Sequence, residues 1–276
     1  MKQIKFEKFI LKKWVRYALL SIFLIVFSYS TFKIGMWILS TIKTNKLTTI
    51  IIEETPITEV SGTSTQNVGE PLEEESDYWK FIKQDFISVD FNNLKERNED
   101  TVAWIYINNT NVNYPVLQTD NNELYLDHAF DRSYNDSGWL FMDYRNDAVN
   151  FGTNTIIYGH SMKNKTMFGS LLKARYKSWY TNTDNQVIKL STPTENTLWQ
   201  IFSIYAIAPE SYYLMTDFGS DSQRQEFFTT MISRSKYNFN VSLTPKDKIL
   251  TLSTCNTSNG DERFVVQAKL IKRMTR

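Results

Sequence analysis

Eight short runs of strand-forming residues follow one another along the C-terminal part of the chain, and turn-rich segments such as 108–111 separate several of them. The runs occupy residues 102–107, 112–118, 138–142, 154–159, 186–190, 198–208, 248–255 and 263–271. Eight short strands within about 170 residues are typical of a sheet that closes on itself. The sequence therefore predicts a mainly β fold, an eight-stranded barrel.

Three segments have the apolar spacing of helices. Residues 77–96 place apolar side chains four residues apart, which predicts an N-terminal helix across one end of the barrel. Residues 166–175 predict a short second helix. A capping box at Ser222–Gln225, followed by Phe227, predicts a third in the connection between the sixth and seventh strands. Since long connections in compact barrels are often functional, we expect this helix to wall one side of a groove.

The N-terminal segment has the pattern of a membrane anchor. Residues 1–16 hold six basic side chains against one acidic, and residues 17–32 carry no charge. After Lys33 the apolar run resumes to residue 42. A helix over residues 17–42 would be about 39 Å long, enough to cross a hydrocarbon core of roughly 30 Å. We expect a single-pass transmembrane signal anchor over residues 17–42, held in the lipid bilayer.

A cleaved signal peptide is the alternative, but it requires a small-x-small cleavage site, and residues 44–47 offer none. The positive flank over residues 1–16 predicts a cytoplasmic N-terminus and an extracellular location for the rest. Residues 43–76 are polar, which predicts a flexible stalk before a domain over residues 77–276. Beyond residue 16 the chain has 25 basic and 29 acidic residues, which leaves no electrostatic footprint for nucleic acid.

The chain has one cysteine, Cys255, so no internal disulfide can form. In residues 249–255 large apolar side chains alternate with Thr, Ser and Cys, and Cys255 falls on the polar parity of the strand. By the same argument Arg263 falls on the parity of the next run that faces away from the core. A thiol and a guanidinium on the outer faces of two chain-adjacent strands predict a site.

The two histidines are the remaining candidates for proton transfer. His160 follows a strand-like run and precedes a polar turn, which is where a scaffold presents catalytic groups, whereas His128 lies in a loop-like segment. Taken alone, either is more often a hydrogen-bonded surface residue than a catalyst. No metal-ligand spacing and no G-x-S-x-G elbow occurs, so we expect no metal, cofactor or serine nucleophile.

A cysteine, a histidine and an arginine can together perform acyl transfer. The thiolate attacks a peptide carbonyl, and the imidazolium protonates the departing amine. The guanidinium offers fixed donors to the oxyanion, and nearby cations also favour the thiolate.

Residues 251–255, T-L-S-T-C, with Arg263 eight residues later at the head of a strand, resemble the sortases, cysteine transpeptidases of Gram-positive cell surfaces. Further matches to that family occur at residues 102–105, 114–118, 138–143 and 157–160, so the resemblance covers residues 77–276. It implies a sortase-type barrel with His160, Cys255 and Arg263 as the catalytic set. The N-terminal helix and the helix between strands six and seven resemble class B.

The resemblance to class B also implies a reaction and its partners. Members of that class anchor surface proteins that carry a C-terminal sorting motif, N-P-x-T-N-like or related, and some build pili. By this analogy Cys255 cleaves after the threonine of the motif and holds the protein as a thioacyl intermediate. A cell-wall amine of peptidoglycan or its precursor then accepts the protein, so the domain would face the cell wall.

Four further residues are candidates for substrate binding: Ser253, Thr254, Tyr212 and Tyr213. Thr254 has core parity and is equally well explained by packing. Aromatic packing under a long loop explains at least one of the tyrosines. Two other functions fit the same residues, a cysteine endopeptidase that uses water as acceptor and a non-catalytic surface-binding barrel.

Overall fold

The computed structural model describes residues 12–62, 78–255 and 262–276, with the backbone alone at Tyr78, Trp79 and Cys255. The chain divides into two compact units, Met1–Lys43 and Thr44–Arg276. Helix α1, Lys13–Glu54, begins in the first. Among the described residues it is the one helix that is long and apolar enough to cross a membrane, judged by length and composition alone. Residues 1–11 of the expected tail lie outside the described residues.

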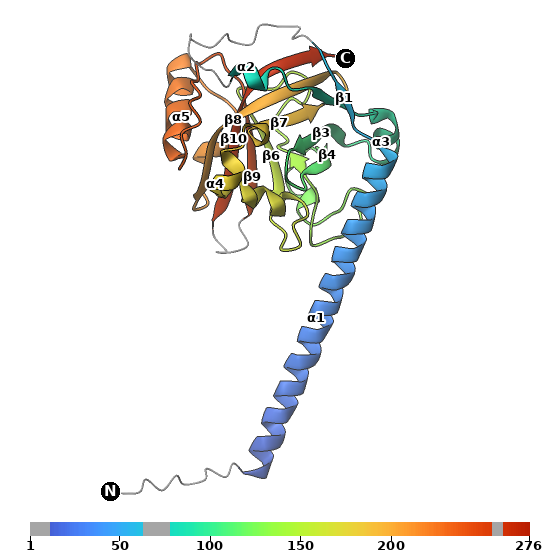
Figure 1. The fold of residues 1–276 in the computed structure, drawn as a ribbon. Coiled ribbons are helices and arrows are strands. Elements are labelled where there is room, and N and C mark those ends of the chain that lie inside the picture. The colour runs from blue at the N-terminus through green and yellow to red at the C-terminus, as the bar shows by residue number, and fades with distance from the viewer. Residues whose placement is uncertain (1–11, 63–77, 256–261) are drawn as a thin grey trace, which may run out of the picture. The chain divides into compact units, whose positions relative to one another are not determined.

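Within the described part of the second unit, eight strands close into a barrel in the order β10-β8-β7-β3-β4-β5-β6-β9 (Figure 1). They are β3 Thr101–Ile107, β4 Asn113–Leu117, β5 Phe141–Met142, β6 Asn154–His160, β7 Val187–Ser191, β8 Glu195–Ile207, β9 Ile249–Cys255 and β10 Arg263–Thr275. Each strand corresponds to one of the eight predicted runs, so the predicted barrel is confirmed. Most neighbours pair antiparallel, but β6 pairs parallel with β9. β4 and β5 are also parallel and share one residue pair, Leu117↔Phe141.

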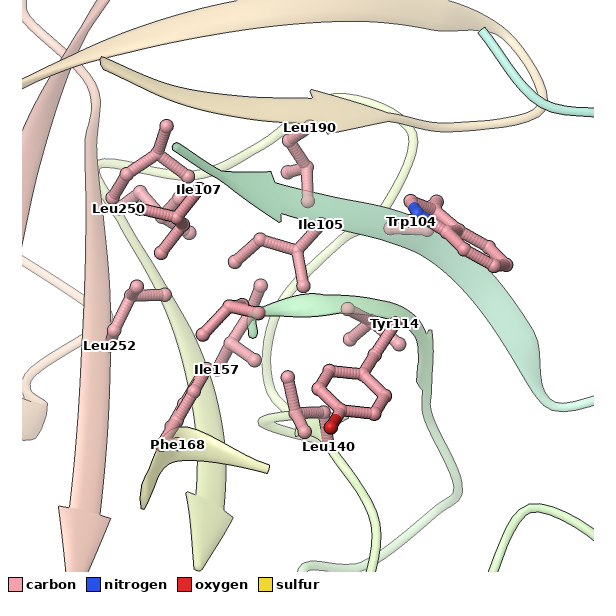
Figure 2. Close-up of a cluster of buried hydrophobic side chains, with 14 of the residues drawn as sticks. Trp104, Ile105, Ile107, Tyr114, Leu140, Ile157, Phe168, Leu190, Leu250 and Leu252 are labelled. Atoms are coloured by element: carbon pink, nitrogen blue, oxygen red, sulfur yellow. The ribbon is translucent and has the colours of Figure 1, made fainter. Parts of the chain in front are cut away.

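Apolar side chains that alternate toward the barrel axis fill the interior. Figure 2 shows Ile105, Leu250 and Leu252 among the side chains that converge from different strands, and none of the three is exposed. The parity that puts Leu250 and Leu252 inside leaves Thr251 and Ser253 on the other face of β9, as predicted.

That outer face is covered rather than open to solvent. Helix α5, Asp221–Arg234, lies beside the barrel (Figure 1), and with the short helix η4, Tyr212–Leu214, it contributes to a second apolar cluster on β8, β9 and β10. Thr251 is fully buried and Ser253 is 4% exposed. The polar outer face predicted from the sequence is therefore correct in residue type, but its hydroxyl groups bond to protein groups: Oγ1 of Thr251 donates to Oδ1 of Asn154 at 2.7 Å, and Oγ of Ser253 lies 3.0 Å from the Tyr213 hydroxyl.

Helix α5 begins two residues earlier than predicted. The N-cap is Ser220, whose side chain accepts a hydrogen bond from the Gln223 N–H. The Gln223 side chain accepts in return from the Gly219 N–H at 2.7 Å. The predicted box started at Ser222 because that residue also has a glutamine three positions later. Ser220 is the cap because Gln223 makes both hydrogen bonds of the motif: its N–H donates to Ser220, and its side chain accepts from Gly219.

The predicted helix over residues 77–96 is wrong in its middle. The segment forms α2 Tyr78–Phe81, β2 Phe86–Ser88 and α3 Phe91–Arg97. Strand β2 replaces the helix because it pairs antiparallel with β1, Thr58–Val60. Asp90 then caps α3 by accepting a hydrogen bond from the Asn92 N–H.

The flexible stalk expected over residues 43–76 is not what the structure shows for residues 44–60. Helix α1 continues to Glu54, which pairs with Arg97, and Ile51 is fully buried in the main core. The polar composition of residues 43–62 did not indicate this packing, because few side chains of the segment are buried. Residues 63–76 lie outside the described residues.

The remaining elements are short helices in the barrel connections. They are η1 Leu124–Leu126, η2 Phe168–Arg175, α4 Lys177–Tyr180 and η3 Thr183–Asn185. The helix predicted over residues 166–175 is therefore present as the 3₁₀ helix η2.

Replacing Ile51 with alanine should lower the free energy of unfolding by about 2–5 kcal/mol, because a fully buried isoleucine leaves a cavity in the core. Thr49→Ala, at an exposed position of the same helix, should change it by less than about 0.5 kcal/mol. Denaturant titration of the full chain measures both values. Equal stabilities of the two variants would contradict the packing of residues 44–54 in the domain.

Candidate active site

Three strands bring the predicted histidine, cysteine and arginine positions into one row. His160 pairs with Cys255 in the parallel β6–β9 ladder, and Cys255 pairs with Arg263 in the antiparallel β9–β10 ladder. Paired positions on neighbouring strands lie on the same face of a sheet, about 5 Å apart. The three Cα atoms therefore form a row about 10 Å long with Cys255 at its centre. The row lies where β6 and β9 end and β10 begins.

A backbone carbonyl fixes the orientation of His160. The Nε2 atom of His160 lies 2.7 Å from the carbonyl oxygen of Leu126. Because a carbonyl oxygen can only accept, Nε2 carries a hydrogen and donates it. In the neutral imidazole this leaves Nδ1 as the nitrogen without a proton, so the contact fixes both the ring orientation and the tautomer.

A groove with a volume of about 90 Å³ lies beside the row. Tyr158 and Ser253, the next paired positions on the same face of the β6–β9 ladder, lie along it. On the other side η4 contributes Tyr213 and Leu214. Among the residues whose side chains the structure describes, those that line the groove are Leu126, Trp139, Phe141, Tyr158, Gly159, His160, Tyr213, Leu214, Ser253 and Arg263. The predicted groove wall is thus formed by the segment before α5 rather than by α5 itself.

Two side chains hold η4 beside the groove. Nη2 of Arg145 donates to the Leu214 carbonyl at 3.1 Å. Nδ2 of Asn154 donates to the carbonyls of Tyr213 and Met215 at 3.1 and 2.9 Å. Three successive carbonyl groups at the end of η4 are therefore bonded to side chains, and this fixes the wall against the barrel.

A buried carboxylate holds Arg145 in turn. Asp143 has no exposed surface and accepts hydrogen bonds from Nε and Nη2 of Arg145 at 2.8 and 2.7 Å. It also accepts one from the Tyr158 hydroxyl at 2.8 Å. Burial opposes ionisation of Asp143, but the hydrogen bonds from Arg145 and Tyr158 outweigh it and lower its pKa below the ordinary value. Burial and the charge of Asp143 raise the pKa of Tyr158, so its hydroxyl remains a donor.

The structure places two of the four predicted substrate-binding residues in the groove. Ser253 and Tyr213 line it, with their side-chain oxygens 3.0 Å apart. Tyr212 packs against Phe227 of α5 with ring centres 5.6 Å apart. Thr254 is 1% exposed and has the interior parity of β9. These contacts agree with the packing explanation for Tyr212 and Thr254, and a role of either in substrate binding stays a prediction.

The second histidine has different surroundings. Nδ1 of His128 lies 3.0 Å from the Leu124 carbonyl oxygen and 2.7 Å from Oδ1 of Asp127. His128 is not among the described residues that line the groove. Over residues 12–62, 78–255 and 262–276, no group of three or more His, Cys, Asp or Glu side chains is placed to hold a metal ion.

Tyr158, Asp143 and Arg145 also contribute to the site, although no role was predicted for them from the sequence. Parity could have found Tyr158, because it precedes His160 by two positions on one strand and so shares its face. No pattern pointed to Arg145, since its contact with Leu214 joins segments far apart in the chain.

Comparison with known proteins places these features in a family. The family described as a sortase domain matches residues 105–271. Sortase B of Staphylococcus aureus is 37% identical over 191 residues, which cover 68% of this chain and 78% of that protein. Sortase B of Listeria monocytogenes is 30% identical over 263 residues, which cover 95% of this chain and 98% of that protein.

Solved structures with the same fold are also sortase B proteins. A Staphylococcus aureus sortase B–substrate complex has a TM-score of 0.62 and 38% identity, covering 66% of this chain and 84% of that one. A sortase B complexed with triglycine has a TM-score of 0.62 and 37% identity, covering 66% of this chain and 85% of that one.

Asp143→Asn should lower the free energy of unfolding at neutral pH by about 1.5–3 kcal/mol, because it removes the charged acceptor of Arg145. A lowered folded-state pKa stabilises the fold above the unfolded value, 3.8, and that contribution is lost as the pH falls through the folded-state pKa. The variant should lack this part of the acid sensitivity. Thermal unfolding of both proteins from neutral to acid pH tests this, and parallel curves would contradict it.

Proposed function

The chain belongs to the sortase family of cysteine transpeptidases, and we propose that Cys255 is its nucleophile. Its substrate in this proposal is a surface protein with a C-terminal sorting motif, N-P-x-T-N-like or related. The observation that carries the proposal is the backbone register that sets Cys255 between His160 and Arg263. A thiol nucleophile needs a proton donor and a cation on its own face, and this row supplies both positions.

The first half of the proposed reaction breaks the peptide bond after the threonine of the motif. The Cys255 thiolate attacks the threonine carbonyl carbon and forms a carbon–sulfur bond. The carbon–nitrogen bond then breaks, and the departing amine takes a proton from the His160 imidazolium. Arg263 donates hydrogen bonds to the oxyanion that develops on the carbonyl oxygen.

The second half transfers the protein to an amine. A neutral cell-wall amine attacks the thioester carbon, a new peptide bond forms, and Cys255 leaves as thiolate. His160 takes the proton that the amine loses and is ready for the next cycle. The structure of a sortase B complexed with triglycine supports an amine acceptor, and the sortase B–substrate complex supports a substrate-binding groove.

The groove beside the row is the proposed site of the sorting motif. Ser253 offers a hydroxyl, and Tyr158, Tyr213 and Leu214 offer apolar surface next to His160. An extended peptide in this groove would pass over the Cys255 position, because Tyr158 and Ser253 occupy the next positions along the same two strands.

We also propose where the chain works. Residues 17–42 of α1 would cross the membrane once, with the tail over residues 1–16 in the cytoplasm. The catalytic domain would then face the cell wall, where both the sorting substrate and the acceptor amine are found.

Peptides that carry candidate motifs between a fluorophore and a quencher test the reaction. The full chain in detergent should cleave at least one of them, and an added amine should appear in the product. Cys255→Ala should abolish cleavage, whereas His160→Ala and Arg263→Ala should lower kcat/KM by about 100-fold or more.

His128→Ala is the matched control, since His128 does not line the groove, and it should keep most of the activity. Full activity of Cys255→Ala would disprove the proposed nucleophile. Cleavage that never incorporates the amine would identify a hydrolase instead of a transpeptidase.

The anchor has its own test. The chain isolated from a membrane fraction should retain residues 17–42, and N-terminal sequencing with intact mass measurement checks this. A mature protein that starts near residue 45 would show that the segment is a cleaved signal peptide.

A further inference from the structure

Residues 124–139, which are part of the connection between β4 and β5, supply the carbonyl that contacts His160, and we call them the histidine loop. Leu126 is in its first turn, and its carbonyl oxygen accepts from Nε2 of His160. The peptide before it is fixed, because the Tyr125 carbonyl accepts from the Trp139 N–H at 2.9 Å. The two ends of the loop therefore bond to each other beside the carbonyl that orients the imidazole.

Asn135 fixes the backbone one residue after Leu126. Its N–H donates to the Asp127 carbonyl at 2.8 Å, and its own carbonyl accepts from the Gly138 N–H at 2.8 Å. Its side chain makes two hydrogen bonds: Oδ1 accepts from the Ser137 N–H within the loop at 3.0 Å, and Nδ2 donates to Oγ1 of Thr44 on α1 at 2.7 Å. Asn135 is 2% exposed and Thr44 is not exposed, so water does not compete for this bond. The backbone around Leu126 is thus connected to helix α1.

Helix α1 is a fixed partner at this point. Ile51 lies in the main core, and Glu54 pairs with Arg97 of α3. Thr44 precedes Ile51 by seven residues, two helical turns, so both side chains project from the same side of the helix. The bond from Asn135 therefore ties the histidine loop to an element that is itself packed in the domain.

Gly138 shows how closely the loop approaches the Leu126 carbonyl. Its φ is +54°, in the left-handed region. A Cβ atom at this position would lie 2.6 Å from the Leu126 carbonyl oxygen and 2.5 Å from that of Tyr125. Gly138 therefore packs directly against the carbonyl oxygen that accepts from His160. For this reason we expect a displacement of Asn135 or Gly138 to move that oxygen.

We propose that Asn135 and Thr44 are positioning residues for His160. They hold the Leu126 carbonyl where it accepts from Nε2 and thereby keep Nδ1 free of a proton in the neutral ring. The effect on turnover rests on the proposed role of His160 in proton transfer, whereas the effect on the imidazole itself does not. The end of α1 at residues 44–54 is then part of the catalytic apparatus, although it contributes no residue to the groove.

Nitrogen NMR of the imidazole rings tests the positioning directly. The full chain is labelled at histidine, studied in detergent and given Cys255→Ala so that no thiolate affects the ring. The chain has two histidines, and His128→Gln assigns the two sets of signals. At alkaline pH, where imidazoles are neutral, His160 should show one tautomer with the proton on Nε2. Asn135→Ala and Thr44→Val should convert it to a mixture of both tautomers.

Two variants control for loss of packing alone. Asn185→Ala removes a side chain as buried as Asn135, 2% exposed, which also takes part in two hydrogen bonds, at η3 and outside the groove. It should leave the His160 tautomer unchanged. Thr44→Ser keeps the hydroxyl acceptor and should restore the signal that Thr44→Val changes.

Kinetics on the chain with Cys255 intact give the second measurement. Thr44→Val and Asn135→Ala should lower kcat by about fivefold to tenfold, because the loss of one aligned hydrogen bond corresponds to about that factor in rate. The KM for the motif peptide should stay within about twofold, since proton transfer is impaired rather than binding.

The outcomes separate this inference from the proposed function. Unchanged His160 signals in both Asn135→Ala and Thr44→Val would overturn the positioning, whatever the activity. Altered signals with unchanged kcat would support the positioning and count against His160 as the proton donor. Equal tautomer changes in Asn185→Ala would show a general loosening of the fold and would also overturn it.

Discussion

The parallel pairing of β6 with β9 is the constraint on which the site depends. It joins strands that are far apart in the chain and sets Cys255 opposite His160, while the β9–β10 ladder sets it opposite Arg263. A slip of one residue in either ladder would move one of these positions to the other face of the sheet. The residues that line the groove lie together only when this register is kept. The apolar side chains on the inner face of the same strands keep the register, because a slip would move them out of the core.

The outer face of these strands has a second set of restraints. The apolar cluster under α5 lies on this face, Thr251 is fully buried, and Ser253 lines the groove at the end of the strands. Asp143 and Arg145 connect that groove to the wall at η4, since Asp143 bonds both Tyr158 and Arg145, and Arg145 bonds Leu214. The ion pair, the apolar packing and the strand register thus all restrain the groove. This is why residues from distant parts of the chain are needed to form it.

The sequence predicted what local alternation determines and missed what distant partners determine. All eight barrel strands could be predicted, because each is a short run of strand-forming residues and turn-rich segments separate several of them. Parity within β9 and β10 then predicted one face for Cys255 and Arg263, and their pairing agrees with it. The helix over residues 77–96 was wrong because β2 is a strand only through β1, which lies in the segment taken for a stalk. Ser253 and Tyr213, two of the residues predicted to bind substrate, line the groove, and parity could have added Tyr158. Arg145 contacts the groove wall at Leu214, and no local pattern contains that contact.

The β4–β5 ladder, a single residue pair between Leu117 and Phe141, has a consequence for the motions of the barrel. Strands β10 and β8 are joined by many residue pairs. Separating β4 from β5 therefore breaks far fewer backbone hydrogen bonds than separating β10 from β8 does. Proteins open locally where the fewest such bonds must break, at free energies below that of global unfolding. Phe141 of this pair also lines the groove. The amide hydrogens around β5 should therefore exchange with solvent sooner than those of β8 and β10, so the barrel opens most readily beside the groove.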